Sequence, residues 1–532
     1  MSVSFIDQDY SVRPLWLPDL RKAFEDTPGA ERVVLRLSRG NAEDLDFEIW
    51  IPAAESEGDR ALVSRFVTAT AYNILSVYSG REICFFCSPA VQELIADVPD
   101  GFLRHPGLNK VVKIAQRIHG SLTFSFRPLS EYYVPLKGAK TASETPLAEK
   151  LRSLIGAAEN ACCVGVDVGG SDIKIAASVK GRLVYTEEYN WNPESSPTAE
   201  GIIEPILQVI CRARERIEQT GNRLAAIGLS FPDIVIDDSI VGGETPKTKG
   251  IRENPDADTE TELMKIRELK TRLLSLCSPG GSVRIINDGN MAAFTAAVEL
   301  AAGGDDEEIS KGVLAHSLGT ELGTGWLQAD GTIPAIPLEM YDLLLDLGSH
   351  KYAELPPEDL RSTCNENSRM PGVRRYLGQA GVYRLAWRQC SGLLREYTVM
   401  GGDVLKVPTK PEDLRKPCLE HIMQLAADRN PDAEEVFREI GQNLAVVTRE
   451  INWLLGETPP KRVLFGRFVK SPRCFELLRE GFEEAGTGIE LEAADDNLAN
   501  TSLMRQLAAA PDVTVAQFGQ AVGAIYFSMN NK

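Results

Sequence analysis

The feature that most constrains this chain is a buried strand that carries a carboxylate and then turns on glycine. The stretch 164–177, VGVDVGGSDIKIAA, places Asp167 in an apolar run and follows it with Gly169, Gly170 and Ser171. Glycines permit a tight turn and let backbone amides approach a phosphate with no Cβ in the way. A carboxylate just before such a turn can hold Mg²⁺ or its water shell. An ordinary hairpin turn explains the same residues equally well.

Two later stretches have related chemistry. The segment 319–325, GTELGTG, places small residues and hydroxyls between two apolar strands, as a second phosphate-binding turn would. In the segment 285–290, IINDGN, a strand ends and a helix begins at Asp288. Helix capping accounts for these residue types, whereas a functional interpretation makes Asp288 the acceptor of a hydroxyl proton in phosphoryl transfer. A helix N-terminus keeps that carboxylate ionised and weakens it as a base, but phosphoryl transfer depends chiefly on positioning and charge stabilisation.

Composition excludes several classes of function. The chain has 532 residues, enough for about three compact units. It has 57 Lys and Arg against 76 Asp and Glu, a net charge of −19, which opposes non-specific binding of nucleic acid. No apolar run is long enough to span a membrane and the start does not resemble a signal peptide, so we expect a cytoplasmic protein without a membrane partner. Cys84 and Cys87 have metal-like spacing but no second pair nearby, and we expect them in a buried strand with reduced thiols.

The order of strand-like and helix-like segments divides the chain in two. Residues 1–150 predict an α+β unit with strands at 33–40, 45–52, 82–87 and 121–128, and the unit carries no chemical motif. From about residue 160 strands alternate with helices, beginning with three antiparallel strands, and the last helix lies at 516–529. This alternation predicts an α/β fold.

The motifs VDVGGSDIKIAA, IGLSFPD, TKGI, IINDGN and LGTELGTG occur in the order seen in hexokinases and in the sugar kinases and repressors of the ROK family. Residues 160–530 therefore resemble the actin-like ATPase superfamily. The resemblance implies a two-lobed, ribonuclease H-like α/β fold. Its small lobe would be 156–283, joined by a C-terminal helix at 512–532, and its large lobe 284–511. Residues 1–150 would be an additional N-terminal α+β domain that forms an oligomer or plays a structural role.

The same resemblance implies phosphorylation of a hexose or hexose-like hydroxyl by ATP, with Mg²⁺ as cofactor and Asp288 as the general base. Asp167 would hold the metal through a bridging water. The residues implied at the nucleotide are Asp167, Gly169, Gly170, Ser171, Lys174, Gly319, Thr320, Gly323, Thr324 and Gly466. Those implied at the sugar are Ser230, Phe231, Pro232, Thr248, Lys249, Asn287, Glu339 and Gln379.

Departures from the family pattern qualify that expectation. The cysteine-rich zinc motif of ROK proteins is absent and Asp342 stands where its histidine would fall, so we expect no structural zinc. Gln379 replaces a sugar-binding glutamate, and Gly466 alone remains of a glycine pair near the adenosine. Asp233 follows Ser-Phe-Pro where ROK sequences favour glycine, which favours the hexokinase branch.

Several alternatives stay open from the sequence. Lys247 and Lys249 also suit a solvated surface loop, Glu339 suits an ordinary exposed acid, and Gln379 suits a residue without a functional role. At the level of function, the alternatives are a sugar-binding regulator without turnover and an ATPase that acts on a partner protein. The expected partners are a small sugar and a nucleotide, with a homo-oligomer formed through the N-terminal domain.

Overall fold

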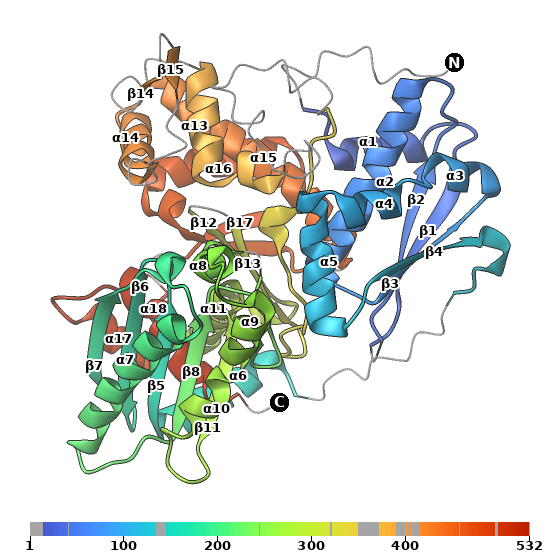
Figure 1. Ribbon diagram of the computed structural model, residues 1–532. Helices are drawn as coiled ribbons and strands as arrows, with labels where there is room; N and C mark the ends of the chain where they lie inside the picture. Colours follow the sequence, from blue (N-terminus) through green and yellow to red (C-terminus); the bar gives the residue numbers. More distant parts are fainter. Residues whose placement is uncertain are drawn as a thin grey trace.

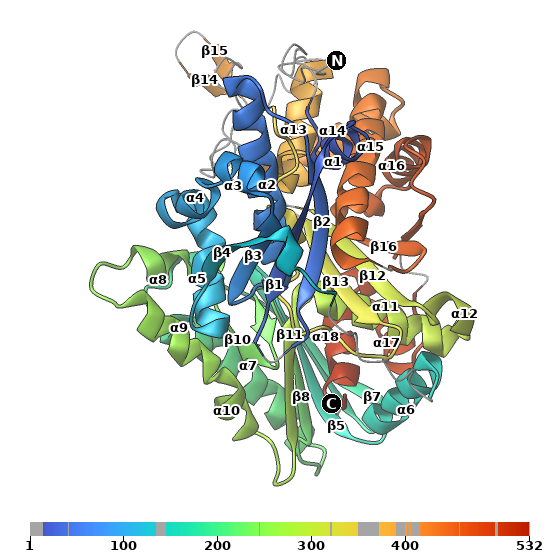
Figure 2. The same cartoon turned by 90° about the vertical axis from the view of Figure 1, so that its right-hand side faces the viewer.

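The computed structural model describes residues 14–40, 42–134, 145–243, 245–319, 322–348, 372–389, 399–401, 404–406, 415–456, 458–494 and 498–530. Figures 1 and 2 show three groups of elements: the N-terminal segment in blue, a first lobe in teal and green, and a second lobe in yellow to red. The C-terminal helix returns to the first lobe.

The first lobe is built on a five-stranded sheet of order β7-β6-β5-β8-β11. Strand β6 runs antiparallel to β5 and β7, whereas β8 and β11 run parallel to β5. The strands are β5 (Cys162–Val168), β6 (Asp172–Val179), β7 (Arg182–Asn190), β8 (Ala226–Phe231) and β11 (Ser282–Asn287). The central strands β5 and β8 are apolar on both faces because helices α7 (Glu200–Glu218) and α18 (Val515–Phe527) both pack on this sheet.

Two glycines let α18 lie directly on the sheet. A Cβ on Gly165 would lie 1.9 Å from the carbonyl oxygen of Ala521, and one on Gly228 would lie 1.8 Å from that of Ala524. Each strand therefore touches helix backbone at a position where no larger residue fits. Helix α18 also contacts α11 (Asp288–Gly303) of the second lobe, so it lies between the two lobes.

The second lobe repeats the strand order of the first. Its sheet has the order β13-β12-β16-β17, with β13 antiparallel to β12 and the other two parallel to it. Strands β6, β5, β8 and β11 of the first lobe have the same order and the same relative directions. The strands are β12 (Gly312–Leu318), β13 (Leu322–Gln328), β16 (Lys461–Gly466) and β17 (Glu490–Ala493). The repeated topology confirms the predicted two-lobed, ribonuclease H-like fold, although no internal repeat is visible in the sequence.

The N-terminal segment forms a four-stranded sheet, β2-β1-β3-β4, covered by helices. Its elements are α1 (Leu17–Glu25), β1 (Glu31–Ser38), β2 (Leu45–Ile51), α2 (Glu57–Tyr78), β3 (Glu82–Cys87), α3 (Pro89–Leu94), α4 (Val98–Arg104), α5 (Pro106–His119) and β4 (Thr123–Pro128). Its apolar side chains share one core with residues 314–491 of the second lobe. The predicted strands of this segment are confirmed, and Cys84 and Cys87 lie buried in β3 with free thiols.

The remaining elements connect the sheets. They are α6 (Leu147–Glu159), β9 (Val235–Ile236), β10 (Ser239–Ile240), α8 (Lys249–Glu253), α9 (Thr259–Arg267), α10 (Leu269–Leu274), α11 (Asp288–Gly303), α12 (Asp306–Ile309), α13 (Gly378–Gln389), β14 (Val399–Gly401), β15 (Val404–Lys406), α14 (Arg415–Ala427), α15 (Pro431–Leu455), α16 (Pro472–Glu484) and α17 (Ser502–Ala508). Within the described residues, none of these helices has the length and apolar character needed to cross a membrane.

Candidate functional site

Two carboxylates lie at the ends of two strands of the first sheet that flank a third. Asp167 is the penultimate residue of β5, and Asp288 begins α11 directly after β11. Strand β8 lies between them and pairs Ser230 with Asp167 on one side. Burial raises the pKa of Asp167 to about 6; the Lys174 ammonium opposes that rise, and the charge of Asp288 adds to it. The two carboxylates are therefore close enough to repel each other.

Asp288 is more basic than its position at a helix N-terminus alone would make it. Burial raises the pKa of its carboxyl above the ordinary value, against the opposing effects of the Lys247 ammonium and the Gly289 N–H. That N–H donates to Asp288 Oδ1 at 2.9 Å. A carboxyl with a raised pKa is better suited to accept a proton near neutral pH than an ordinary exposed aspartate.

Asn287 fixes the start of this helix. Its Oδ1 accepts from the Gly289 N–H at 2.9 Å, and its Nδ2 donates to the Asp233 carbonyl at 3.0 Å. The side chain thus caps α11 and ties it to the loop after β8. Through these bonds Asn287 orients Asp288.

The first glycine turn is held in shape by Trp191 and Asp172. The Gly169 N–H donates to the Asp172 carbonyl at 2.8 Å, while Trp191 donates from Nε1 to the Gly169 carbonyl at 3.1 Å and from its backbone N–H to the Ser171 carbonyl at 3.1 Å. Gly170 and Ser171 are exposed at the tip. Lys174 forms an ion pair with Asp172. The turn is therefore rigid at its base and open at its tip, as a backbone anion cradle requires.

The second turn is docked against the start of α11. Thr320 lies outside the described residues, whereas Gly319 and Gly323 are partly exposed on either side of it. Thr324 is buried, and its hydroxyl is hydrogen-bonded to His316 Nδ1 at 2.9 Å. The hydroxyl of Thr324 is thus engaged inside the lobe.

A cavity of about 1170 Å³ opens beside the second turn. Gly319 and Gly466 line it, together with residues of α11, α16 and α18. Gly466 has a φ of +97°, and a Cβ there would lie 2.3 Å from the Leu318 carbonyl oxygen. Gln379 also lines this cavity and donates its N–H to the Gly319 carbonyl at 3.1 Å. The structure thus brings Gln379 to the second turn.

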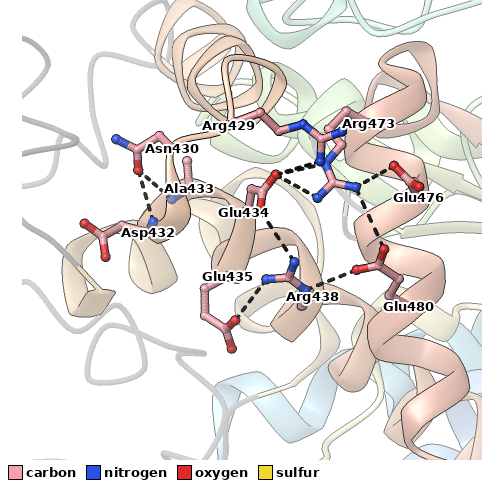
Figure 3. A network of polar contacts seen from close by, with 10 residues as sticks. All are labelled: Arg429, Asn430, Asp432, Ala433, Glu434, Glu435, Arg438, Arg473, Glu476 and Glu480. Carbon is pink, nitrogen blue, oxygen red and sulfur yellow. Dashed lines mark hydrogen bonds and ion pairs between the residues drawn. The ribbon is translucent and has the colours of Figure 1, made fainter.

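Charged side chains fix one wall of this cavity (Figure 3). Glu434 near the start of α15 accepts from Arg473 at 2.7 Å and forms a longer ion pair with Arg429 at 3.3 Å. Arg473 also pairs with Glu476 at 2.5 Å. Because Arg429, Arg473 and Glu476 line the cavity, this network holds α15 and α16 at a set distance along its wall.

The predicted sugar segments lie in the first lobe near Asp288. Ser230, Phe231 and Pro232 are buried. The Thr248 hydroxyl donates to the Gly243 carbonyl at 3.1 Å, so it shapes the loop. Lys249 begins α8 and is partly exposed.

Lys247, two residues before Lys249, is the lysine that acts on the carboxylates. Its charge opposes the raised pKa of both Asp288 and Asp233. It also approaches the first turn, since a Cβ on Gly170 would lie 3.8 Å from Lys247 Cε. The resemblance implies Lys249, and not Lys247, as the sugar-binding lysine of this loop.

Glu339 brings the second lobe to the same region. It is buried, and its pKa is raised to about 8, first by burial and further by the charges of Asp342 and Asp233, while Lys110 opposes the rise. Asp233 itself accepts from the Gly243 N–H at 2.5 Å. A buried, proton-retaining carboxyl can donate as well as accept a hydrogen bond.

Sequence reasoning missed Trp191 and Lys110. Trp191 follows the third strand of the first lobe. Nothing in the residues around it indicates that it bonds to the turn about twenty residues earlier. Lys110 comes from the N-terminal segment, which carries no motif. Asp342 is ion-paired with Lys110 and with Arg374, the latter at 3.0 Å.

Among the described residues, no group of three or more His, Cys, Asp or Glu is arranged to hold a metal.

No protein-family model matches the chain, and no curated protein matches its sequence. Solved structures with a similar fold include a ROK-family glucokinase from Streptomyces griseus in complex with glucose and AMPPNP. It is 18% identical, with a TM-score of 0.41, and the match covers 69% of this chain and 99% of that one. Glucokinase from Balamuthia mandrillaris in complex with glucose is 14% identical, with a TM-score of 0.43 and coverage of 72% and 99%. A ROK-family transcriptional regulator, a homologue of E. coli MLC protein, is 13% identical, with a TM-score of 0.42 and coverage of 70% and 81%.

Proposed function

We propose that the protein phosphorylates a hydroxyl of a hexose or hexose-like sugar with ATP. The observation that carries the proposal is that Asp167 and Asp288 lie at the ends of β5 and β11, the two strands that flank β8, and that the charge of Asp288 raises the pKa of Asp167. One carboxylate lies near the end of the strand that leads into an open glycine turn, and the other begins a helix that packs on the second turn. Phosphoryl transfer needs this combination of an anion cradle, a metal-binding carboxylate and a group that accepts the hydroxyl proton.

The nucleotide would occupy the cavity beside Gly319 and Gly466. Its phosphates would meet the exposed amides of Gly170 and Ser171 on one side and the turn after Gly319 on the other. Asp167 suits Mg²⁺, which typically takes one or two protein carboxylates and completes its shell with phosphate oxygens and water. When bound, Mg²⁺ neutralises charge on the phosphates.

The acceptor would lie between Lys247 and Glu339, beside Asp288. Asp288 takes the proton of the attacking hydroxyl, and the raised pKa of its carboxyl suits that role. The positive charge of Lys247 would partly neutralise the carboxylates of Asp288 and Asp233. Glu339 would orient the sugar by a hydrogen bond.

A coupled assay of ADP release tests the proposal with a panel of hexoses and amino sugars. We expect turnover that depends on one sugar, or on a few, and on Mg²⁺. Hydrolysis of ATP at the same rate with and without sugar would instead support an ATPase that acts on a partner. Sugar binding by calorimetry without any ADP release would support a regulator, and either result would overturn the kinase.

A further inference from the structure

Helix α5 belongs to the N-terminal segment but contacts both lobes. Both views place it between the N-terminal sheet and α9 of the first lobe. Its Ile114 packs in a small apolar cluster with Ile234 and Val241 of the first lobe. Lys110 and Arg117 lie about two turns apart on the helix and engage different lobes.

Lys110 engages the segment of the second lobe that carries Glu339. Its ammonium forms an ion pair with Asp342, and the two side chains are only 12% and 7% exposed. The Lys110 Nζ also lies 5.2 Å from the centre of the Tyr341 ring. Arg374 holds the other oxygen of Asp342 at 3.0 Å. The turn that follows Glu339 is therefore fixed by buried charges, one of which comes from α5.

The backbone of this segment is also attached to the N-terminal segment. The N–H groups of Leu338 and Glu339 donate to the carbonyls of Val77 and Ser76, at 3.0 and 3.1 Å. Both acceptors lie at the end of α2. Leu338 has a φ of +56°, which a leucine adopts only where its surroundings enforce it. The position of Glu339 is thus imposed by contacts from outside its own lobe.

Arg117 engages the loop of the first lobe that carries Lys247. Its Nη1 donates to the Gly242 carbonyl at 2.8 Å, and its guanidinium pairs with Glu260 of α9 at 2.7 Å. The next residue, Gly243, is bonded to Asp233 through its N–H and accepts from the Thr248 hydroxyl through its carbonyl. Arg117 therefore fixes the start of the loop that ends at Lys247.

We propose that Lys110 and Arg117 are positioning residues that set the acceptor site from outside it. One rigid helix holds Glu339 on one side and the Lys247 loop on the other. The N-terminal segment thereby determines the distance between the two sides of the sugar site. The acceptor part of this inference rests on the proposed function, whereas the placement of the two segments does not.

The kinetic test compares Lys110→Met and Arg117→Met with Lys113→Ala, which changes an exposed lysine of the same helix. We expect each of the first two changes to raise the KM for the sugar about ten-fold or more and to leave the KM for ATP within about two-fold. Lys110→Arg keeps the positive charge, so its KM for the sugar should rise less than that of Lys110→Met. Equal changes in both KM values, or none, would overturn the proposal.

A second measurement does not need activity. Amide hydrogen exchange at Leu338 and Glu339 should speed up in Lys110→Met, and exchange at Gly243 should speed up in Arg117→Met, relative to Lys113→Ala. Exchange unchanged in both variants would show that α5 does not hold the segments. If ADP release by the wild-type protein does not depend on sugar but amide exchange is faster in the methionine variants, the proposed function is overturned. The placement of the two segments by α5 then still stands. If a methionine variant does not fold, Lys110→Arg and Arg117→Lys provide the comparison with smaller expected effects, because each keeps the positive charge.

Discussion

Gly289 and Gly325 touch through their backbones. A Cβ on Gly325 would lie 1.8 Å from the carbonyl oxygen of Gly289, and a Cβ on Gly289 would lie 2.3 Å from the carbonyl oxygen of Thr324. The first glycine follows Asp288, and the second lies on β13 just after the second turn. This contact brings the candidate base and the candidate phosphate turn together, although the two glycines are 36 positions apart in the sequence. Neither glycine has a positive φ, so close approach and not backbone conformation requires them.

Gly325→Ala should therefore destabilise the protein, by about 3 kcal/mol or more, because backbone must move to make room for the methyl group. Urea unfolding followed by circular dichroism measures the loss. Gly319→Ala is the matched control, since nothing lies within 4 Å of a Cβ at that position. It should leave stability within about 0.5 kcal/mol and raise the KM for ATP, because the methyl group would face the nucleotide. Equal stability of the two variants would contradict the close contact.

Asp288→Ala should lower kcat by about 10²–10⁴-fold with the fold intact, because no other group is proposed to take the hydroxyl proton. Asp288→Asn is the sharper variant, since it keeps the size of the side chain and removes the base. The same ADP-release assay at saturating sugar measures both. A variant that keeps most of its sugar-dependent turnover would remove Asp288 from the mechanism.

Asp167→Asn should weaken the response to Mg²⁺ more than the response to sugar. The amide cannot supply the negative charge that a hard cation prefers. The Mg²⁺ concentration for half-maximal turnover should rise about ten-fold or more, while the KM for sugar changes little. The substitution also removes the repulsion between Asp167 and Asp288. An unchanged Mg²⁺ dependence would show that this carboxylate does not hold the metal.

The sequence predicts the fold well because its signals are local. Strand periodicity, glycine turns and the carboxylate at 167 all lie within stretches of about ten residues, and the order of these stretches defines the two lobes. The contacts that complete the site are long-range. Lys110 meets Asp342 across 232 residues, and nothing in the residues around either one encodes that pairing. Lys247 lies in a short helical turn and Lys249 begins α8, and periodicity does not specify which of the two lysines acts on the carboxylates.

Glu339 should make stability depend on pH. Its folded pKa of about 8 lies above its ordinary value of 4.5, so the folded protein binds this proton more tightly than the unfolded chain does. That contribution is fully present below the ordinary pKa and is lost as the pH rises toward about 8. Glu339→Gln removes it, so the variant should gain stability relative to wild type between about pH 5 and pH 9. Urea unfolding across that range measures the difference, and parallel curves for the two proteins would contradict a raised pKa.

Arg21→Met should show that the N-terminal segment and the second lobe unfold together. Arg21 of α1 forms a salt bridge at 2.7 Å with Glu450 of α15, whose side chain is fully buried. Asn73 also donates to this carboxylate, at 2.9 Å. Removing the arginine leaves a buried charge without its counter-ion, which costs about 3–5 kcal/mol. Asp19→Asn is the control, because it breaks an exposed ion pair with Arg449 between the same two helices and should cost less than about 1 kcal/mol. Since the two parts share one core, the loss should appear in a single unfolding transition. A separate early transition confined to the N-terminal segment would show instead that it folds on its own.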